Sequence, residues 1–325
     1  MTSRRKQIET KRNNNYLIVK TTPLKEDENN KKQIYNYYLT SFPNAKTSND
    51  SEESKDILND LNKYSSKNEY LDEIYINLLL DEKNFEKKIN PEYFNFQKSI
   101  NYKMRAILVD WIIDIHSHFK FLIKTLFQCV YIIDAYLSKK NIDKKYLQLL
   151  GVASLLISCK ENEIIYPSLN KLIQLTDNAY TISELKKMEI KIMQILNFDI
   201  LGPTAEEFFE INAEYFNFSE EHKYLGEFLL KCSLIDYKML KYNQSTIAIA
   251  CGYITMKCFN LEGIDLILKN GNFNIKPKEI KNCAKELCFL VKELFKSSFG
   301  VVKNIYVSNI SNIITKLKYN WILRD

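Results

Sequence analysis

The stretch MRAILVDWIIDI, residues 104–115, decides the fold class, because its apolar side chains recur at helical spacing. One stripe of this predicted helix consists of Met104, Leu108, Trp111 and Ile115, and the adjacent stripe of Arg105, Val109 and Ile112. Both stripes are mainly apolar, so the helix is buried on more than one face, or is buried on one face and free to bind on another. A guanidinium in such a stripe needs a buried partner, and Asp134, on the apolar stripe of the next predicted helix, is the candidate for Arg105.

The rest of the chain continues the helical pattern. Only 7 Gly and 6 Pro occur in 325 residues, and so few turn-forming residues exclude an all-β protein. We predict a short amphipathic helix near 68–83 and five helices between 98 and 200, one of which starts at a cap formed by Thr181 or Ser183 with Glu184. After the Gly202-Pro203 break, five further helices are predicted, at 204–215, 219–236, 243–259, 276–296 and 303–317. Two halves of five helices each indicate a duplicated all-α fold.

These patterns divide the chain into four parts. Residues 1–66 are polar, with Asn, Lys, Ser and acidic clusters, and we expect them to form a disordered N-terminal tail. Residues 67–97 hold the N-terminal helix and a linker, residues 98–201 form the first five-helix unit, and residues 202–325 form the second.

Charge and cysteine usage restrict the class of protein further. The net charge is +6, but Lys and acidic residues are interspersed along the predicted helices, which favours a solvated surface over a nucleic-acid footprint. The 7 Cys are scattered without a CxxC pair and indicate small buried residues in a reducing compartment. The N-terminus lacks the apolar core of a secretory signal, and no apolar run is long enough for a membrane span.

Motifs for catalysis are absent. No GxGxxG, GxxxxGK[ST] or GxSxG pattern occurs, so the sequence gives no reason to expect a phosphate cradle or a nucleophile elbow. His116 and His118 are two residues apart and face nearly opposite sides of a helix, so they cannot form a metal-binding pair. We therefore expect no metal, no cofactor and no catalytic residue.

A second informative stretch is 146–160, which is apolar almost all round and carries small residues that allow close helix contacts. We predict that it is the central helix of a bundle and that Lys160 ends it. Taken alone, Lys160 is a favourable charge at a helix C-terminus. Glu189, on the apolar stripe of a later helix, would be an edge carboxylate paired with Lys186 or Lys187.

Several ordered motifs resemble one family. Five motifs in order, with near-fixed spacing over about 100–210, together resemble the cyclin box of mitotic A- and B-type cyclins. They are MRAILVDWIIDIH, TLFQCVYIIDAYLS, LQLLGVASLLISCKENEIIYPS, TDNAYT and LKKMEIKIMQILNFDILGPTAEEFF. YLDEIYINLLLDE resembles the family's N-terminal helix, and LLKCSLIDYKMLKYNQSTIAIACGYITMK the start of its second fold. The resemblance implies two tandem five-helix cyclin folds and a non-catalytic regulatory subunit, found in nucleus and cytoplasm, that binds and activates a cyclin-dependent Ser/Thr protein kinase.

The resemblance also implies which residues act. The kinase-contacting positions fall on Lys160, Glu189 and Glu163, and the internal salt bridge on Arg105 and Asp134. The substrate-docking patch, for Arg-x-Leu-type motifs of substrates or inhibitors, falls on Met104, Leu108, Trp111, Asp114 and Gln148. The chain departs from the family at Glu161-Asn162, where an aromatic residue and Glu are usual, and at Ala135, where Arg is common.

Other interpretations remain open at this point. Thr22, followed by Pro23, matches the target pattern of the kinases that cyclins activate and is a candidate phosphosite. The rival functions are a transcription-factor-IIB-like module, a helical scaffold that does not activate a kinase, and an unrecognised enzyme. The first would need a basic stripe in one repeat and an N-terminal zinc ribbon, and neither is evident in the sequence.

Overall fold

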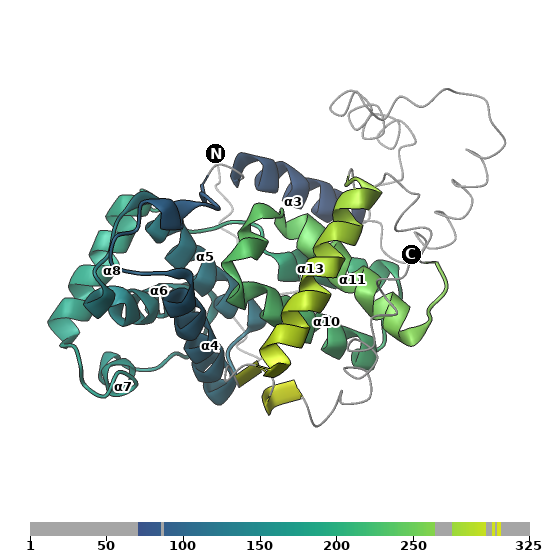
Figure 1. Ribbon diagram of the computed structural model, residues 1–325. Coiled ribbons are helices and arrows are strands. Elements are labelled where there is room, and N and C mark those ends of the chain that lie inside the picture. The colour runs from purple at the N-terminus through teal and green to yellow at the C-terminus, as the bar shows by residue number, and fades with distance from the viewer. Residues whose placement is uncertain (1–70, 86–87, 264–274, 297–300, 303, 307–325) are drawn as a thin grey trace, which may run out of the picture. The chain divides into compact units, whose positions relative to one another are not determined.

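The computed structural model describes residues 71–85, 88–263, 275–296, 301–302 and 304–306. Within these ranges all regular secondary structure is helical, as the sequence predicts (Figure 1). The predicted tail 1–66, the candidate phosphosite Thr22 and most of the helix predicted at 303–317 lie outside the described residues. No described helix is both long and apolar enough to cross a membrane.

The helices form an N-terminal element and two repeats. Helix α3 (Leu71–Phe85) precedes both repeats. The first repeat comprises α4 (Tyr102–Phe119), α5 (Ile123–Lys139), α6 (Leu147–Asn162), α7 (Leu169–Gln174) and α8 (Ile182–Leu196). The second comprises α9 (Ala205–Tyr215), α10 (Glu220–Ile235), α11 (Gln244–Phe259) and α13 (Pro277–Lys296). Short 3-10 segments lie at Tyr93–Asn95, Lys144–Tyr146 and Tyr237–Lys241.

Each repeat is built around one helix that is buried on all sides. In the first repeat α6 packs against α4, α5 and α8, and in the second α11 packs against α9, α10 and α13. Both helices are apolar around their whole circumference, which is typical of a central helix. Helix α6 runs two residues beyond Lys160 to Asn162, so the predicted end at Lys160 is wrong. The side-chain amide of Asn162 donates to the carbonyl of Ser158 (3.1 Å) in this last turn.

Capping residues set several helix starts. Thr181 and Glu184 form a capping box at α8, which selects Thr181 over Ser183 as the cap, and Thr204 and Glu207 form another at α9, just after the Gly202-Pro203 break. Each box satisfies two backbone N–H groups that a helix start leaves without a partner.

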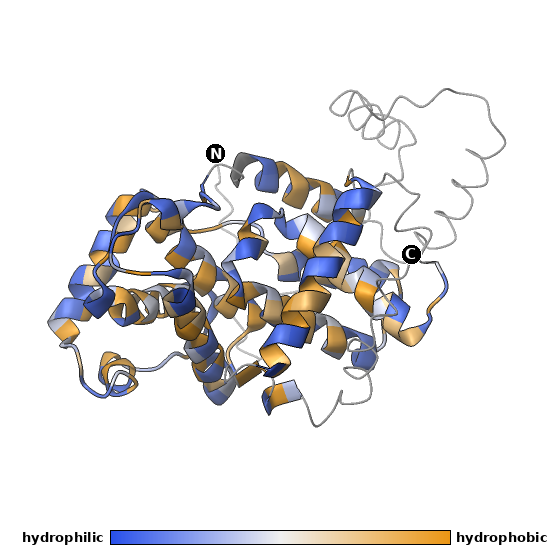
Figure 2. Cartoon of the chain, in the orientation of Figure 1, coloured by the Kyte–Doolittle hydropathy of each residue, from blue (hydrophilic) through white to orange (hydrophobic). Residues whose placement is uncertain are grey.

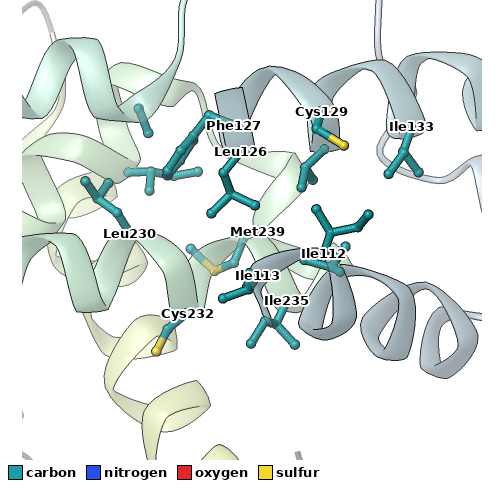
Figure 3. Packing of buried hydrophobic residues seen from close by; sticks show 14 of the residues in the cluster. Ile112, Ile113, Leu126, Phe127, Cys129, Ile133, Leu230, Cys232, Ile235 and Met239 are labelled. Carbon is teal, nitrogen blue, oxygen red and sulfur yellow. The ribbon is translucent and has the colours of Figure 1, made fainter. Parts of the chain in front are cut away.

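The two repeats share one apolar core. Figure 3 shows Ile112 and Ile113 of α4 and Leu126 and Phe127 of α5 beside side chains of the second repeat. The second repeat contributes Leu230, Cys232 and Ile235 of α10 and Met239 of the 3-10 segment that follows it. Since these side chains are nearly fully buried, the repeats stabilise each other through continuous apolar packing.

Candidate functional site

Arg105 lies at the centre of a buried polar network that joins both repeats. Its Nε donates to Oδ1 of Asp134 (2.7 Å) and its Nη2 to Oδ2 (2.6 Å), so the predicted partner forms a bidentate ion pair. The Tyr93 hydroxyl donates to the same carboxylate (2.8 Å). Both charged side chains are only 1% exposed, so the pair lies inside the protein.

The remaining guanidinium nitrogen of Arg105 reaches the second repeat. Nη1 donates to the carbonyls of Leu234 (2.8 Å) and Ile235 (3.1 Å) at the end of α10. Burial acts to lower the pKa of Arg105, but Asp134 and Tyr93 outweigh it and the pKa rises above its usual value. Burial, followed by the Asp134 charge, raises the pKa of Tyr93. Sequence periodicity found the ion pair but missed Tyr93 and the two carbonyls, which no local pattern connects to Arg105.

Lys160 and Glu189 form an ion pair with each other at the surface of the first repeat. The Lys160 ammonium at the end of α6 donates to Oε1 of Glu189 on α8. The Lys160 side chain is 43% exposed and that of Glu189 is 19% exposed, so a partner protein can reach both side chains. The alternative pairing of Glu189 with Lys186 or Lys187 is not what the structure contains.

Exposed apolar side chains lie next to this ion pair along the chain, and some of them share a groove with it. Ile164 is 98% exposed and Ile165 86%, in the loop that follows α6, and Ile190 of α8 is 57% exposed. A groove of about 470 Å³ lies beside them, lined by Lys160, Tyr166, Pro167, Ser168, Leu169, Lys186, Glu189 and Ile190. We call the ion pair together with Ile164, Ile165, Tyr166 and Ile190 the α6–α8 face. Exposed apolar side chains grouped in one patch, with polar groups beside them, are typical of a protein interaction site.

Glu163 has a structural task beside that face. Its carboxylate accepts from the Leu122 N–H (2.8 Å) and from the Thr125 hydroxyl (2.6 Å), at the start of α5. The N-cap residue of α5 is Leu122, whose side chain cannot cap, so Glu163 supplies the acceptor from 41 residues away. The kinase contact implied for Glu163 stays a prediction. A kinase would have to share this carboxylate with the start of α5.

The residues of the predicted docking patch lie at different depths. Met104, Trp111 and Gln148 are half-buried and Asp114 is exposed, whereas Leu108 is only 5% exposed. Leu108 packs on Gly151 of α6, where an added Cβ would lie 2.7 Å from Leu108 Cδ1. Leu108 therefore belongs mainly to the core, and the absence of a side chain at Gly151 lets α4 and α6 approach.

The outward apolar residue on this part of α4 is Ile107, which is 58% exposed. It lies three residues after Met104 and four before Trp111, so the three share one helical face. The sequence pattern did not identify Ile107, because an apolar stripe does not show whether another helix covers it. We call Met104, Ile107, Trp111, Asp114 and Gln148 the α4 strip.

Comparison with known proteins agrees with this geometry. The family model described as "Cyclin, N-terminal domain" matches residues 73–201, and "Cyclin, C-terminal domain" matches residues 203–316. The chain is 36% identical over 238 residues to the G2/mitotic-specific cyclin-B2 of Gallus gallus and 32% identical over 239 residues to the G2/mitotic-specific cyclin-B of Hydra vulgaris, in each case over 73% of this chain. It spans 57% and 65% of those two relatives.

A solved structure supports the fold. A viral cyclin from herpesvirus saimiri superposes with a TM-score of 0.60 over 68% of this chain and 97% of the viral one, at 21% sequence identity. At this identity the likeness concerns the arrangement of helices alone, and that arrangement is the two-repeat fold described above.

Proposed function

The chain belongs to the cyclin family, and from that premise we propose that it binds and activates a cyclin-dependent Ser/Thr protein kinase. Cyclins are non-catalytic regulatory subunits, so the kinase would supply all the chemistry. The G2/mitotic-specific names of the relatives make cell division the process in which such a complex would act. The distribution between nucleus and cytoplasm stays a prediction.

The observation that carries this proposal is the α6–α8 face. Leaving Ile164 and Ile165 almost fully in water forgoes roughly 1.5–3 kcal/mol for each side chain, which a partner would recover on burying it. Lys160 and Glu189 pair with each other in the unbound chain, and both can offer hydrogen bonds to polar groups of a partner. In protein interfaces a few desolvated residues supply most of the binding energy, and Lys160 and Glu189 become such residues when a partner covers the apolar side chains beside them.

Activation would act on a two-state element of the kinase. A protein kinase is active when its β3 Lys pairs with the Glu of helix αC and its activation loop is ordered. A partner that packs on αC in the inward position binds the active state better and shifts the population toward it. We infer that the α6–α8 face is the surface that packs on αC.

We further propose that the chain recruits substrates to the kinase through the α4 strip. Met104, Ile107 and Trp111 offer apolar area to a leucine, and Asp114, three residues beyond Trp111, offers a carboxylate to an arginine. Gln148, at the start of α6, can donate amide hydrogen bonds to an extended peptide. These groups fit an Arg-x-Leu-type segment of a substrate or inhibitor.

The test combines binding and activity. Purified chain alone should transfer no phosphate, and addition of a matching cyclin-dependent kinase should give phosphorylation of Ser/Thr-Pro peptides. Lys160→Ala or Glu189→Ala should weaken kinase binding by about 2–5 kcal/mol, the usual cost of truncating one partner of a buried interfacial charge pair. Folding stability should change by less than about 1 kcal/mol, because in the unbound chain the pair is at the surface.

The control is Lys139→Ala, which removes an exposed lysine at the end of α5. It should leave both kinase binding and activation unchanged. If the chain neither binds nor stimulates any member of a panel of cyclin-dependent kinases, the activator function is wrong. That result would favour the alternative of a helical scaffold that does not activate a kinase. If it activates a kinase but the alanine variants behave as wild type, the α6–α8 face has been misassigned.

A further inference from the structure

Helix α13 of the second repeat carries a heptad repeat. The triplet Lys-Glu-Ile/Leu occurs at 278–280, 285–287 and 292–294, seven residues apart each time. The apolar members Ile280, Leu287 and Leu294 are buried against the repeat, together with Ala284 and Val291. Because one side of the helix is fixed in this way, the Lys and Glu residues before each apolar member must point outward. Hydrophilic and hydrophobic bands accordingly alternate along α13 in Figure 2.

The lysines gather into one row on the outer side. At 100° per residue, Lys278, Lys281, Lys285 and Lys292 lie within an arc of about 60°, and the row spans about 20 Å of helix. Lys278 and Lys285 are exposed, and Lys281 and Lys292 are half-buried. In the described parts of the chain, none of the four lies within ion-pair distance of a carboxylate. Lys and Glu are interspersed along this helix in sequence, as expected, but the helical twist separates them into two neighbouring rows.

The glutamates of the same triplets form a parallel row that is already largely neutralised. Glu286 pairs with Lys241 of the neighbouring 3-10 segment (2.6 Å) and Glu293 with Lys296 (2.9 Å). Glu279 forms no ion pair among the described residues, so four uncompensated lysines face one uncompensated glutamate and the net charge left on this side of α13 is positive. Charge complementarity favours an acidic partner.

A single aromatic side chain lies between the two rows. Phe289 is 63% exposed, although it is part of a helix whose other apolar side chains are mostly buried. It follows Lys285 by four residues and precedes Lys292 by three, so it borders both lysines on the helix surface. An exposed aromatic residue surrounded by charged groups is the usual arrangement of an interface anchor and its polar rim.

We propose that the outer face of α13, consisting of Lys278, Lys281, Lys285, Phe289 and Lys292, binds an acidic peptide segment of a partner protein, with an apolar side chain of that segment packed on Phe289. An extended segment of about six to seven residues covers the length of the lysine row. This site belongs to the second repeat, in which α13 packs on α10 and α11, and it is independent of the α6–α8 face of the first repeat.

The glutamate row and Phe289 distinguish a peptide from other anions. A nucleic-acid duplex or an anionic membrane presents negative charge over a surface wider than one helix, and would bring phosphates onto Glu279, Glu286 and Glu293. A peptide one chain wide can follow the lysine row alone. It can also supply an aliphatic side chain to pack on Phe289, whereas a single-stranded nucleic acid would place a stacked base there, and the test distinguishes these two outcomes.

The test uses a fluorescein-labelled twelve-residue peptide of alternating Glu and Ser with two central Leu residues, titrated with the full chain and followed by fluorescence anisotropy. We expect micromolar affinity that falls with added salt. Lys278→Glu with Lys285→Glu should weaken binding at least tenfold, and Phe289→Ser at least fivefold. A peptide with Gly in place of both Leu residues should bind the wild-type chain several-fold more weakly.

The matched control is Lys139→Glu with Lys140→Glu, which reverses two exposed lysines of the first repeat and changes the net charge by the same amount. It should alter binding less than twofold. Equal weakening by both double variants, or no effect of Phe289→Ser, would overturn the proposal. So would tighter, lysine-row-dependent binding of a single-stranded oligonucleotide or of phosphatidylserine vesicles. Kinase activation by the Lys278→Glu, Lys285→Glu variant should equal that of wild type, which separates this test from that of the proposed function.

Discussion

Glu82 of α3 caps helix α11 from 163 residues away. Its carboxylate accepts from the backbone N–H of Ser245 (2.8 Å) and from the Ser245 hydroxyl (2.5 Å), and the Glu82 side chain is buried. The N-cap residue of α11 is Asn243, whose side chain makes no capping hydrogen bond. A carboxylate at a helix N-terminus satisfies a backbone N–H that would otherwise lack a partner and interacts favourably with the helix dipole. The N-terminal helix is therefore held on the second repeat by a specific contact as well as by apolar packing.

Removal of this cap should destabilise the protein. Glu82→Ala should lower the free energy of unfolding by about 1–3 kcal/mol, because a buried N–H and hydroxyl lose their acceptor. Glu82→Gln, which keeps an acceptor oxygen but loses the charge, should cost less. Urea unfolding of the three proteins checks the order. A Glu82→Ala variant as stable as wild type would mean that the contact contributes nothing.

Loss of Arg105 should be more costly. Arg105→Ala leaves the Asp134 carboxylate buried with only the Tyr93 hydroxyl, and the carbonyls of Leu234 and Ile235 lose a donor. We expect a loss of about 3–5 kcal/mol in thermal or urea unfolding, as for other broken buried ion pairs. Tyr93→Phe removes one hydrogen bond from the same network and should cost about 1–2 kcal/mol. An unchanged melting temperature for Arg105→Ala would contradict the buried network.

Two buried glycines offer a matched pair. A Cβ at Gly226 of α10 would lie 1.9 Å from Cζ of Phe209, whose ring is itself buried, whereas a Cβ at Gly252 of α11 would meet no heavy atom within 4 Å. Gly226→Ala should therefore destabilise by about 1–3 kcal/mol or more through overpacking. Gly252→Ala should be neutral or stabilise by up to about 1 kcal/mol, since Ala is the better helix former. Equal effects of the two changes in urea unfolding would contradict the packing of α9 against α10.

Glu206, in the first turn of α9, predicts a dependence of stability on pH. Burial, followed by the charges of Glu207 and Glu210, raises the pKa of Glu206 to about 7. The folded state then binds more protons than the unfolded state between about pH 4.5 and 7, so this group makes stability fall as the pH rises through that range. Glu206→Gln should stabilise the protein at pH 8 and lose that advantage below about pH 4.5. The same increment at both pH values would show that Glu206 titrates normally.

The α4 strip can be tested without disturbing the core. Ile107→Ser changes an exposed side chain, so the melting temperature should stay near that of wild type, while binding of a labelled Arg-x-Leu peptide should weaken by about 1–2 kcal/mol. Trp111→Ala should weaken the same binding by about 2 kcal/mol or more if Trp111 is the anchor. Ile74→Ser, which changes a similarly exposed residue of α3, is the control. Docking unaffected by Ile107→Ser would remove the strip from the proposed function.

The sequence by itself determined what depends on neighbours along the chain. Helical stripes placed the helices, and Thr181 with Glu184 marked a helix start, because both depend on residues three to seven positions apart. The two repeats followed from the order of those helices on either side of the Gly202-Pro203 break. Arg105 and Asp134 were matched by the same means, since a charge on an apolar stripe demands a buried counter-charge.

Only the tertiary structure decided which apolar stripes pack against each other and which distant side chain caps a given helix. Glu82 caps α11 and Glu163 caps α5 although each pair lies far apart in sequence, and no local pattern encodes such a partner. Leu108 is buried and Ile107 is exposed, because α4 packs closely on Gly151 of α6 through the side of the helix that carries Leu108. The exposure of Ile164, Ile165 and Phe289 likewise depends on what the other helices leave uncovered, and that is a property of the packed fold rather than of periodicity.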